Sequence, residues 1–69
     1  MVMFNAKQIL ELRKAMGLTQ PEFAKLIGVT ASAVCLWESG KRHPPYKKML
    51  KINEVAKKAG LIPAEKQPA

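Results

Sequence analysis

The sequence predicts an all-α protein, a compact bundle of about four helices, and three observations support this fold class. Apolar residues recur at helical spacing in four stretches. Each stretch is followed by a glycine, which allows the backbone to leave a helix sharply. The chain has 69 residues, a size at which one core is only marginally sufficient, and this favours a small helical bundle over a long sheet. We expect one domain at 1–62, a flexible tail at 63–69, and helices at about residues 6–16, 20–27, 31–39 and 46–59.

The first helix, at 6–16, has a start signal and a stop signal. Asn5 and Gln8 have the spacing of a capping pair, in which each side chain accepts a hydrogen bond from the backbone N–H of the other residue. Gly17 ends the helix, and Leu18 is expected to contact the helix end. Because Thr19 starts the next helix, the connection between the two helices is very short.

The second helix, at 20–27, begins with a capping box. Thr19 can cap the first turn while Glu22 reaches back to the cap amide, and Pro21 stands in the first turn, where its missing N–H costs little. Gly28 then supplies the positive φ needed for a tight turn, and Thr30 is the expected N-cap of the next helix.

The third helix, at 31–39, is expected to have two unlike faces. At about 100° per residue, Val34 and Trp37 fall on one side, which we interpret as the core face. The opposite side carries mostly small residues. Gly40 stops the helix.

The fourth helix, at 46–59, follows an exposed loop. Pro44 and Pro45 prevent a helix from continuing through this segment, because proline lacks an N–H donor and constrains the residue before it. Lysines stand largely between the apolar positions of the helix, which Gly60 closes. We expect Leu61 and Ile62 to fold back on the bundle or to contribute to a dimer surface.

Charge distinguishes this composition, with twelve Lys and Arg against five Asp and Glu, a formal net charge of +7. Such an excess indicates a polyanionic partner, although a basic surface that serves only solubility is the alternative. One cysteine and one histidine provide neither an internal disulfide nor a zinc site, so we expect no metal and no cofactor. No leader pattern and no apolar run long enough to span a membrane are present, which favours a cytoplasmic protein without a membrane partner.

A large set of residues stands in the register of one known motif. The set consists of Leu12, Arg13, Gly17 to Gln20, Glu22 to Ala24, Leu26 to Thr30, Val34, Trp37, Glu38 and Gly40 to Arg42. Through these residues the chain resembles the Cro and phage-repressor type of helix-turn-helix, the Xre-like DNA-binding domain. The properties of the residues are consistent with this motif, because Ala24 is small where the second helix would cross the third and Gly28 makes the turn between them.

The resemblance implies roles for individual residues. Bases would be read in the major groove by a set on the third helix and the start of the second, namely Gln20, Ala31, Ser32, Cys35 and Leu36. DNA phosphates would be contacted by Thr30, Ser32, Lys41, Arg42, Lys47 and Lys48. Arg13 and Glu38 match a buried ion pair that joins the first helix to the third, which is structural, and none of these residues is expected to be catalytic.

The third helix departs from the usual pattern at its reading face. Ala31, Cys35 and Leu36 stand where the family has polar residues, so few side chains remain for hydrogen bonds to bases. We hypothesise that Ala31 and Leu36 contact thymine methyl groups, and that DNA shape, together with Lys41 or Arg42, supplies the remaining specificity. The same departure leaves a rival open, in which Ala31, Cys35 and Leu36 form a protein-binding surface.

The function we expect is sequence-specific binding of double-stranded DNA by a small transcriptional repressor, encoded by a bacterium or a phage. The resemblance implies a homodimer, formed in solution or only on DNA, and a partly palindromic operator. An autoregulatory antitoxin with a toxin partner is an alternative. An enzyme is not supported, because neither His43 nor Cys35 has a catalytic partner within sequence reach. The sequence leaves open whether His43 and Tyr46 contact phosphates and whether Cys35 is redox-active.

Overall fold

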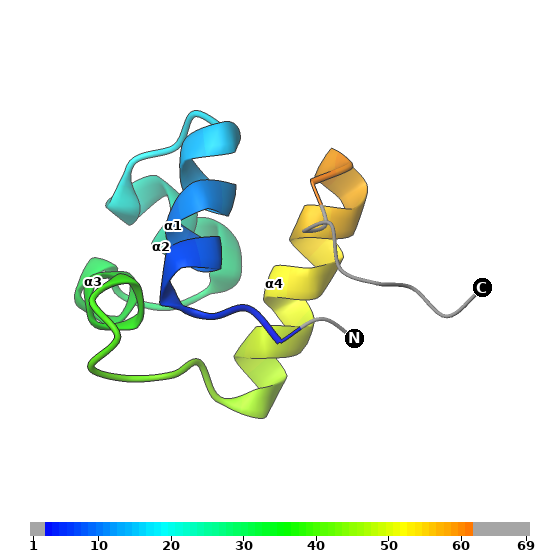
Figure 1. Ribbon diagram of the computed structural model, residues 1–69. Coiled ribbons are helices and arrows are strands. Elements are labelled where there is room, and N and C mark those ends of the chain that lie inside the picture. Colours follow the sequence, from blue (N-terminus) through cyan, green and yellow to red (C-terminus); the bar gives the residue numbers. More distant parts are fainter. Residues whose placement is uncertain (1–2, 62–69) are drawn as a thin grey trace.

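The structure is a computed structural model that describes residues 3–61 of the chain. It consists of α1 (Ala6–Ala15), α2 (Gln20–Ile27), α3 (Ala31–Glu38) and α4 (Tyr46–Ala59), with no strand among the described residues (Figure 1). The predicted all-α fold is confirmed. The expected tail at 63–69, and Ile62 before it, lie outside the described residues.

Helices α1 and α3 each end one residue earlier than the sequence predicts. Met16 and Ser39 are their C-caps, with ψ values of −6° and −7°, and each is followed by a glycine with positive φ. The backbone therefore begins to leave the helix one residue before the glycine that the sequence shows as the stop.

The predicted capping boxes of α1 and α2 are confirmed. The N–H of Gln8 donates to Asn5 Oδ1 over 2.8 Å, and the N–H of Asn5 donates to Gln8 Oε1 over 3.0 Å. At α2 the N–H of Glu22 donates to Thr19 Oγ1 over 3.3 Å, and the N–H of Thr19 donates to Glu22 Oε1 over 2.8 Å. The bond from the Thr19 backbone lowers the pKa of Glu22. These bonds satisfy amides that a helix start would otherwise leave unpaired.

The connection between α2 and α3 is short because Gly28 adopts φ +89°, in the left-handed region. The N–H groups of Gly28 and Val29 both donate to the carbonyl oxygen of Ala24, over 2.8 and 2.9 Å. Thr30 then caps α3 by accepting a hydrogen bond from the N–H of Ala33 over 3.2 Å. Three residues thus end one helix, turn the chain and start the next.

The core joins all four helices and the segment before α1. Its buried apolar side chains are Phe4, Ile9, Leu12, Phe23, Ala24, Ile27, Val34, Trp37, Met49, Ile52, Val55 and Ala56. Figure 1 shows α1, α2 and α3 grouped together with α4 beside them. Leu61 packs against this core, as expected.

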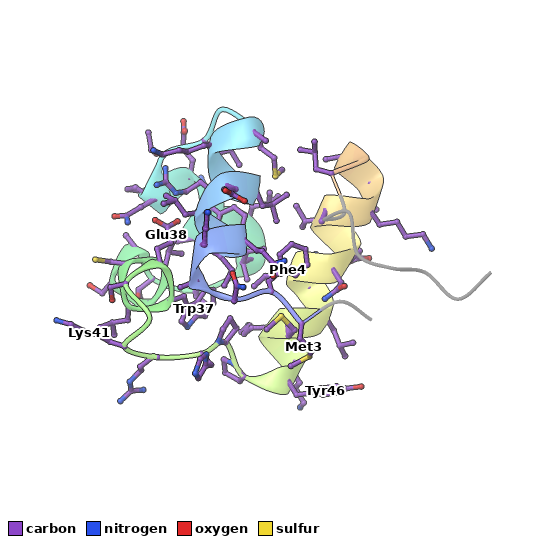
Figure 2. The ribbon with its side chains drawn as sticks, viewed as in Figure 1. Met3, Phe4, Trp37, Glu38, Lys41 and Tyr46 are labelled. Carbon is purple, nitrogen blue, oxygen red and sulfur yellow. The ribbon has the colours of Figure 1, made fainter. Side chains whose placement is uncertain are left out.

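The core differs from the sequence prediction in three respects. Pro44 is buried, although the loop that contains it was expected to be exposed. Phe4, which precedes the first predicted helix, is only 2% exposed and lies between α1 and α4 (Figure 2). Tyr46 and Leu50 belong to the apolar pattern of the fourth helix but are 67% and 42% exposed. The core-facing stripe of α4 is therefore narrower than its apolar pattern, and the N-terminal segment covers part of the core. Within residues 3–61 no helix is both long and apolar enough to cross a membrane.

Candidate nucleic-acid interface

Helix α3 presents one face to solvent and buries the other. Val34 and Trp37 are 0% and 4% exposed, which confirms the predicted core face. Ser32 and Cys35 are exposed on the opposite side, and Leu36 is half-buried beside them. The outward surface of α3 is therefore built from small side chains, so the helix backbone can come close to another molecule.

Ala31 lies at one edge of this outward surface. It is half-buried, and it precedes Glu38 by seven residues, or about two helical turns, so the two residues share an edge of α3. Of the five residues predicted to read bases, four thus belong to the outward face of α3 or its edges, and Gln20 belongs to the start of α2.

The end of α3 passes directly into the basic loop. The carbonyl oxygen of Leu36 accepts hydrogen bonds from the N–H groups of Lys41 and Arg42, over 3.1 and 3.3 Å, and from Ser39 Oγ over 3.0 Å. These bonds hold the backbone of Lys41 and Arg42 against the carboxyl end of α3. Figure 2 shows Lys41 directed into solvent at this end of α3, whereas Trp37 points into the protein. The hydroxyl hydrogen of Ser39 is engaged within the protein.

Arg13 and Glu38 form an ion pair between α1 and α3. Arg13 Nε lies 2.6 Å from Glu38 Oε2, and a second guanidinium nitrogen lies 3.1 Å from Oε1, so the pair is bidentate. The side chains are 14% and 6% exposed. Arg13 also donates to the carbonyl oxygen of Leu18 over 2.9 Å, which ties the α1–α2 connection to the pair.

Gln20 joins this network from the start of α2. Its Nε2 donates to Glu38 Oε1 over 3.0 Å, so residues of α1, α2 and α3 meet at one carboxylate. Burial raises the pKa of Glu38, but hydrogen bonds from Arg13 and Gln20 and the charges of Arg13 and Lys14 outweigh it and hold that pKa below its usual value. Glu38 is therefore ionised at neutral pH, and its charge is compensated.

Most of the predicted phosphate-contacting residues are exposed. They are Thr30, Ser32, Lys41, Arg42 and Lys47. Lys48 differs from these, because it is half-buried and its Nζ donates to the carbonyl oxygen of Gly28 over 3.4 Å. A cation at the carboxyl end of α2 complements the partial negative charge of that helix end. Lys48 thus supports the turn between α2 and α3.

A groove lies between α3 and the start of α4, and the sequence reasoning did not find it. We call it the α3–α4 groove; its volume is about 240 Å³, and its lining residues are Val29, Ala33, Leu36, Trp37, Arg42, His43, Pro45 and Lys48. The only sequence signal for it is the helical spacing of Val29, Ala33 and Trp37. The groove depends on where the proline loop places α4, which this spacing does not specify.

The sequence did not determine the roles of three further side chains, those of Tyr46, His43 and Cys35. Tyr46 is 67% exposed, so it does not fill the core. His43 and Cys35 are also exposed. Among residues 3–61, no group of three or more His, Cys, Asp or Glu side chains is placed to hold a metal ion.

Comparison with known proteins identifies the fold. No curated protein matches the chain. Residues 9–59 match the model of a family described as helix-turn-helix, which confirms the resemblance seen in the sequence. The match covers most of α1 and all of α2, α3 and α4, so it includes the turn at Gly28, the exposed face of α3 and the basic loop. The chain belongs to the helix-turn-helix family of DNA-binding transcription regulators.

Proposed function

We propose that the protein is a repressor that binds a specific sequence in double-stranded DNA by placing α3 in the major groove. The observation that carries this proposal is the charge around the exposed face of α3. Between residues 30 and 48 the chain has four Lys or Arg residues and one carboxylate, Glu38, whose charge is compensated by Arg13. A surface with a small-residue ridge and uncompensated cations suits a negatively charged, grooved partner.

The phosphate contacts fix the position of α3 on the duplex. Exposed Lys41 and Arg42 follow α3 directly, and Lys47 lies in the first turn of α4. The hydroxyl oxygen of Thr30 accepts a hydrogen bond from the N–H of Ala33, so the hydroxyl hydrogen remains free to donate to a phosphate oxygen. The hydroxyl of Ser32 can also donate to a phosphate oxygen. These groups supply affinity but little sequence information.

Base reading is shared between a few polar groups and apolar contact. The Ser32 hydroxyl is the main hydrogen-bonding group on the exposed face, and the Gln20 amide retains one N–H beyond its bond to Glu38. Ala31 and Leu36 would contact thymine methyl groups, while Cys35 lies between these residues. Because direct hydrogen bonds are few, DNA shape contributes the rest of the specificity.

The operator is partly palindromic in this proposal, because two copies of the chain bind neighbouring half-sites about one helical turn apart. Leu61, a candidate for the dimer surface, packs on the core of its own chain. We therefore propose a dimer that forms on DNA. The protein acts in the cytoplasm of a bacterial cell, as a bacterial or phage-encoded repressor.

The experiment is a binding selection on randomised duplexes, followed by affinity measurements over a range of salt concentrations. The log–log salt slope should be about −0.9 per phosphate contacted. In Lys41→Gln the slope should become shallower by about 0.9, the value for one phosphate contact. In Lys57→Gln, which replaces an exposed lysine in the last turn of α4, the slope should not change. Leu36→Ala should lose a thymine preference at one position of the selected site.

Other results would contradict the proposal. If the selected duplexes shared no common sequence, binding would not be sequence-specific. If the salt slope were near zero, the protein would not contact DNA phosphates. Salt-insensitive binding to a protein through Ala31, Cys35 and Leu36 would favour an adaptor. Specific DNA binding together with a stable complex with a toxin protein would favour an antitoxin over a simple repressor.

A further inference from the structure

The α3–α4 groove is lined by apolar and by basic side chains. Val29, Ala33, Leu36 and Pro45 provide apolar surface, and Trp37, which is 4% exposed, also lines the groove. A cavity of about 150 Å³ holds a benzene ring. The groove measures about 240 Å³, so it has room for one aromatic ring and a small polar group.

The polar residues that line the groove all carry basic side chains. They are Arg42, His43 and Lys48, and no carboxylate lines the groove. Lys48 uses one donor on the Gly28 carbonyl oxygen, and an ammonium group has three. Arg42 is exposed, and its guanidinium offers a planar fork that matches a carboxylate. The lining of the groove thus favours a ligand that combines an anionic group with an apolar body.

We propose that the α3–α4 groove binds a small organic anion with a flat apolar body and a single carboxylate. The ring would lie against Trp37 and the apolar walls, and the carboxylate would accept hydrogen bonds from Arg42 and Lys48. Inorganic phosphate would match the charge but leave the apolar walls in water, while a neutral ring would leave the cations unmatched. Both parts of the ligand are therefore required.

This ligand opposes DNA binding. Arg42 and Leu36 belong both to the groove and to the proposed DNA interface, so a bound anion neutralises one phosphate-contacting cation and covers one base-reading side chain. This regulatory step rests on the proposed function, whereas binding of the anion does not. The anion acts as an inducer that releases the repressor from its operator.

The test uses Trp37, which is the only tryptophan in the chain and lines the groove. Benzoate and trans-cinnamate are titrated into the full chain, and the NMR signal of the Trp37 indole N–H is followed. Benzamide and inorganic phosphate serve as ligand controls. The same titrations are repeated with Arg42→Gln and with Lys57→Gln, a charge-matched variant in the last turn of α4.

At least one of the two carboxylates is expected to give a saturable shift. Benzamide and phosphate should bind more weakly than that carboxylate, by about tenfold or more. Arg42→Gln should weaken binding of the carboxylate by about tenfold, because a charged hydrogen bond is lost, and Lys57→Gln should leave it unchanged. Equal binding of benzamide, equal binding by Arg42→Gln, or no saturable shift with either carboxylate would overturn the proposal.

A competition assay then tests the regulatory step with a selected duplex. The carboxylate that binds should release the DNA from the wild-type protein and should do so less effectively from Arg42→Gln. DNA that stays bound at saturating carboxylate would overturn regulation. Failure of the proposed function would be recognised separately, as absence of specific DNA binding without any carboxylate present.

Discussion

Removal of Arg13 should destabilise the fold strongly. In Arg13→Met the aliphatic stem is largely kept, but Glu38, 6% exposed, loses both of its bonds to the guanidinium. Breaking one side of a buried pair costs about 3–5 kcal/mol, and because this pair is partly exposed the expected loss is about 3 kcal/mol. A protein of 69 residues has a total stability of roughly 3–10 kcal/mol, so much of it would be lost.

The effect should depend on pH in a defined direction. In the wild type the pKa of Glu38 is lowered, so its stabilising contribution is present above the ordinary carboxyl pKa and is lost as pH falls through the lowered value. Without Arg13, only the hydrogen bond from Gln20 and the charge of Lys14 oppose the increase in pKa that burial causes. The pKa of Glu38 should therefore be higher than in the wild type. Protonation then relieves the buried charge, so the stability difference between wild type and Arg13→Met should shrink as pH falls.

Thermal unfolding followed by circular dichroism measures both effects. Each kcal/mol corresponds to about 4–8 °C in a domain of this size, so Tm should fall by roughly 12–24 °C at neutral pH. Lys7→Met, which removes an exposed charge from the same helix, should change stability by less than about 0.5 kcal/mol. The double variant Arg13→Met/Glu38→Gln should recover part of the loss, because the stranded charge is gone. An Arg13→Met protein as stable as Lys7→Met, or a difference from wild type that does not change with pH, would refute the reasoning.

Three further outcomes are expected from the fold. Phe4→Ala should cost about 3–5 kcal/mol in chemical denaturation, whereas Met3→Ala, at a side chain 64% exposed, should stay within about 0.5 kcal/mol; equal losses would show that Phe4 is not part of the core. Gly28→Ala should cost about 1–2 kcal/mol because φ is +89°, and it should weaken DNA binding, while Gly60→Ala, with φ +70°, should cost a similar amount without affecting DNA affinity. Thr19→Ala should lower the stability measured by thermal unfolding by about 1 kcal/mol through loss of the α2 cap, and an unchanged Tm would contradict that role.

The fold class and the helix starts followed from the sequence because their causes are local. The capping bonds of Asn5 with Gln8 and of Thr19 with Glu22 join residues three apart, and the turn at Gly28 depends on the φ of one residue. Helical spacing likewise separated the core face of α3 from its exposed face. The pair of Arg13 with Glu38 was expected only through the family resemblance, since 25 residues separate the partners.

The remaining features depended on how the helices pack. The burial of Phe4, the exposure of Tyr46 and the bond from Gln20 to Glu38 depend on contacts between segments that are far apart in the chain. The same holds for the α3–α4 groove and for the bond from Lys48 to Gly28, which require α4 to lie beside the turn. Local hydrogen bonding and periodicity therefore determined which residues form helices and which sides are apolar. Only the tertiary structure decided which charges are paired and where a groove opens, because these depend on the distance and angle between helices.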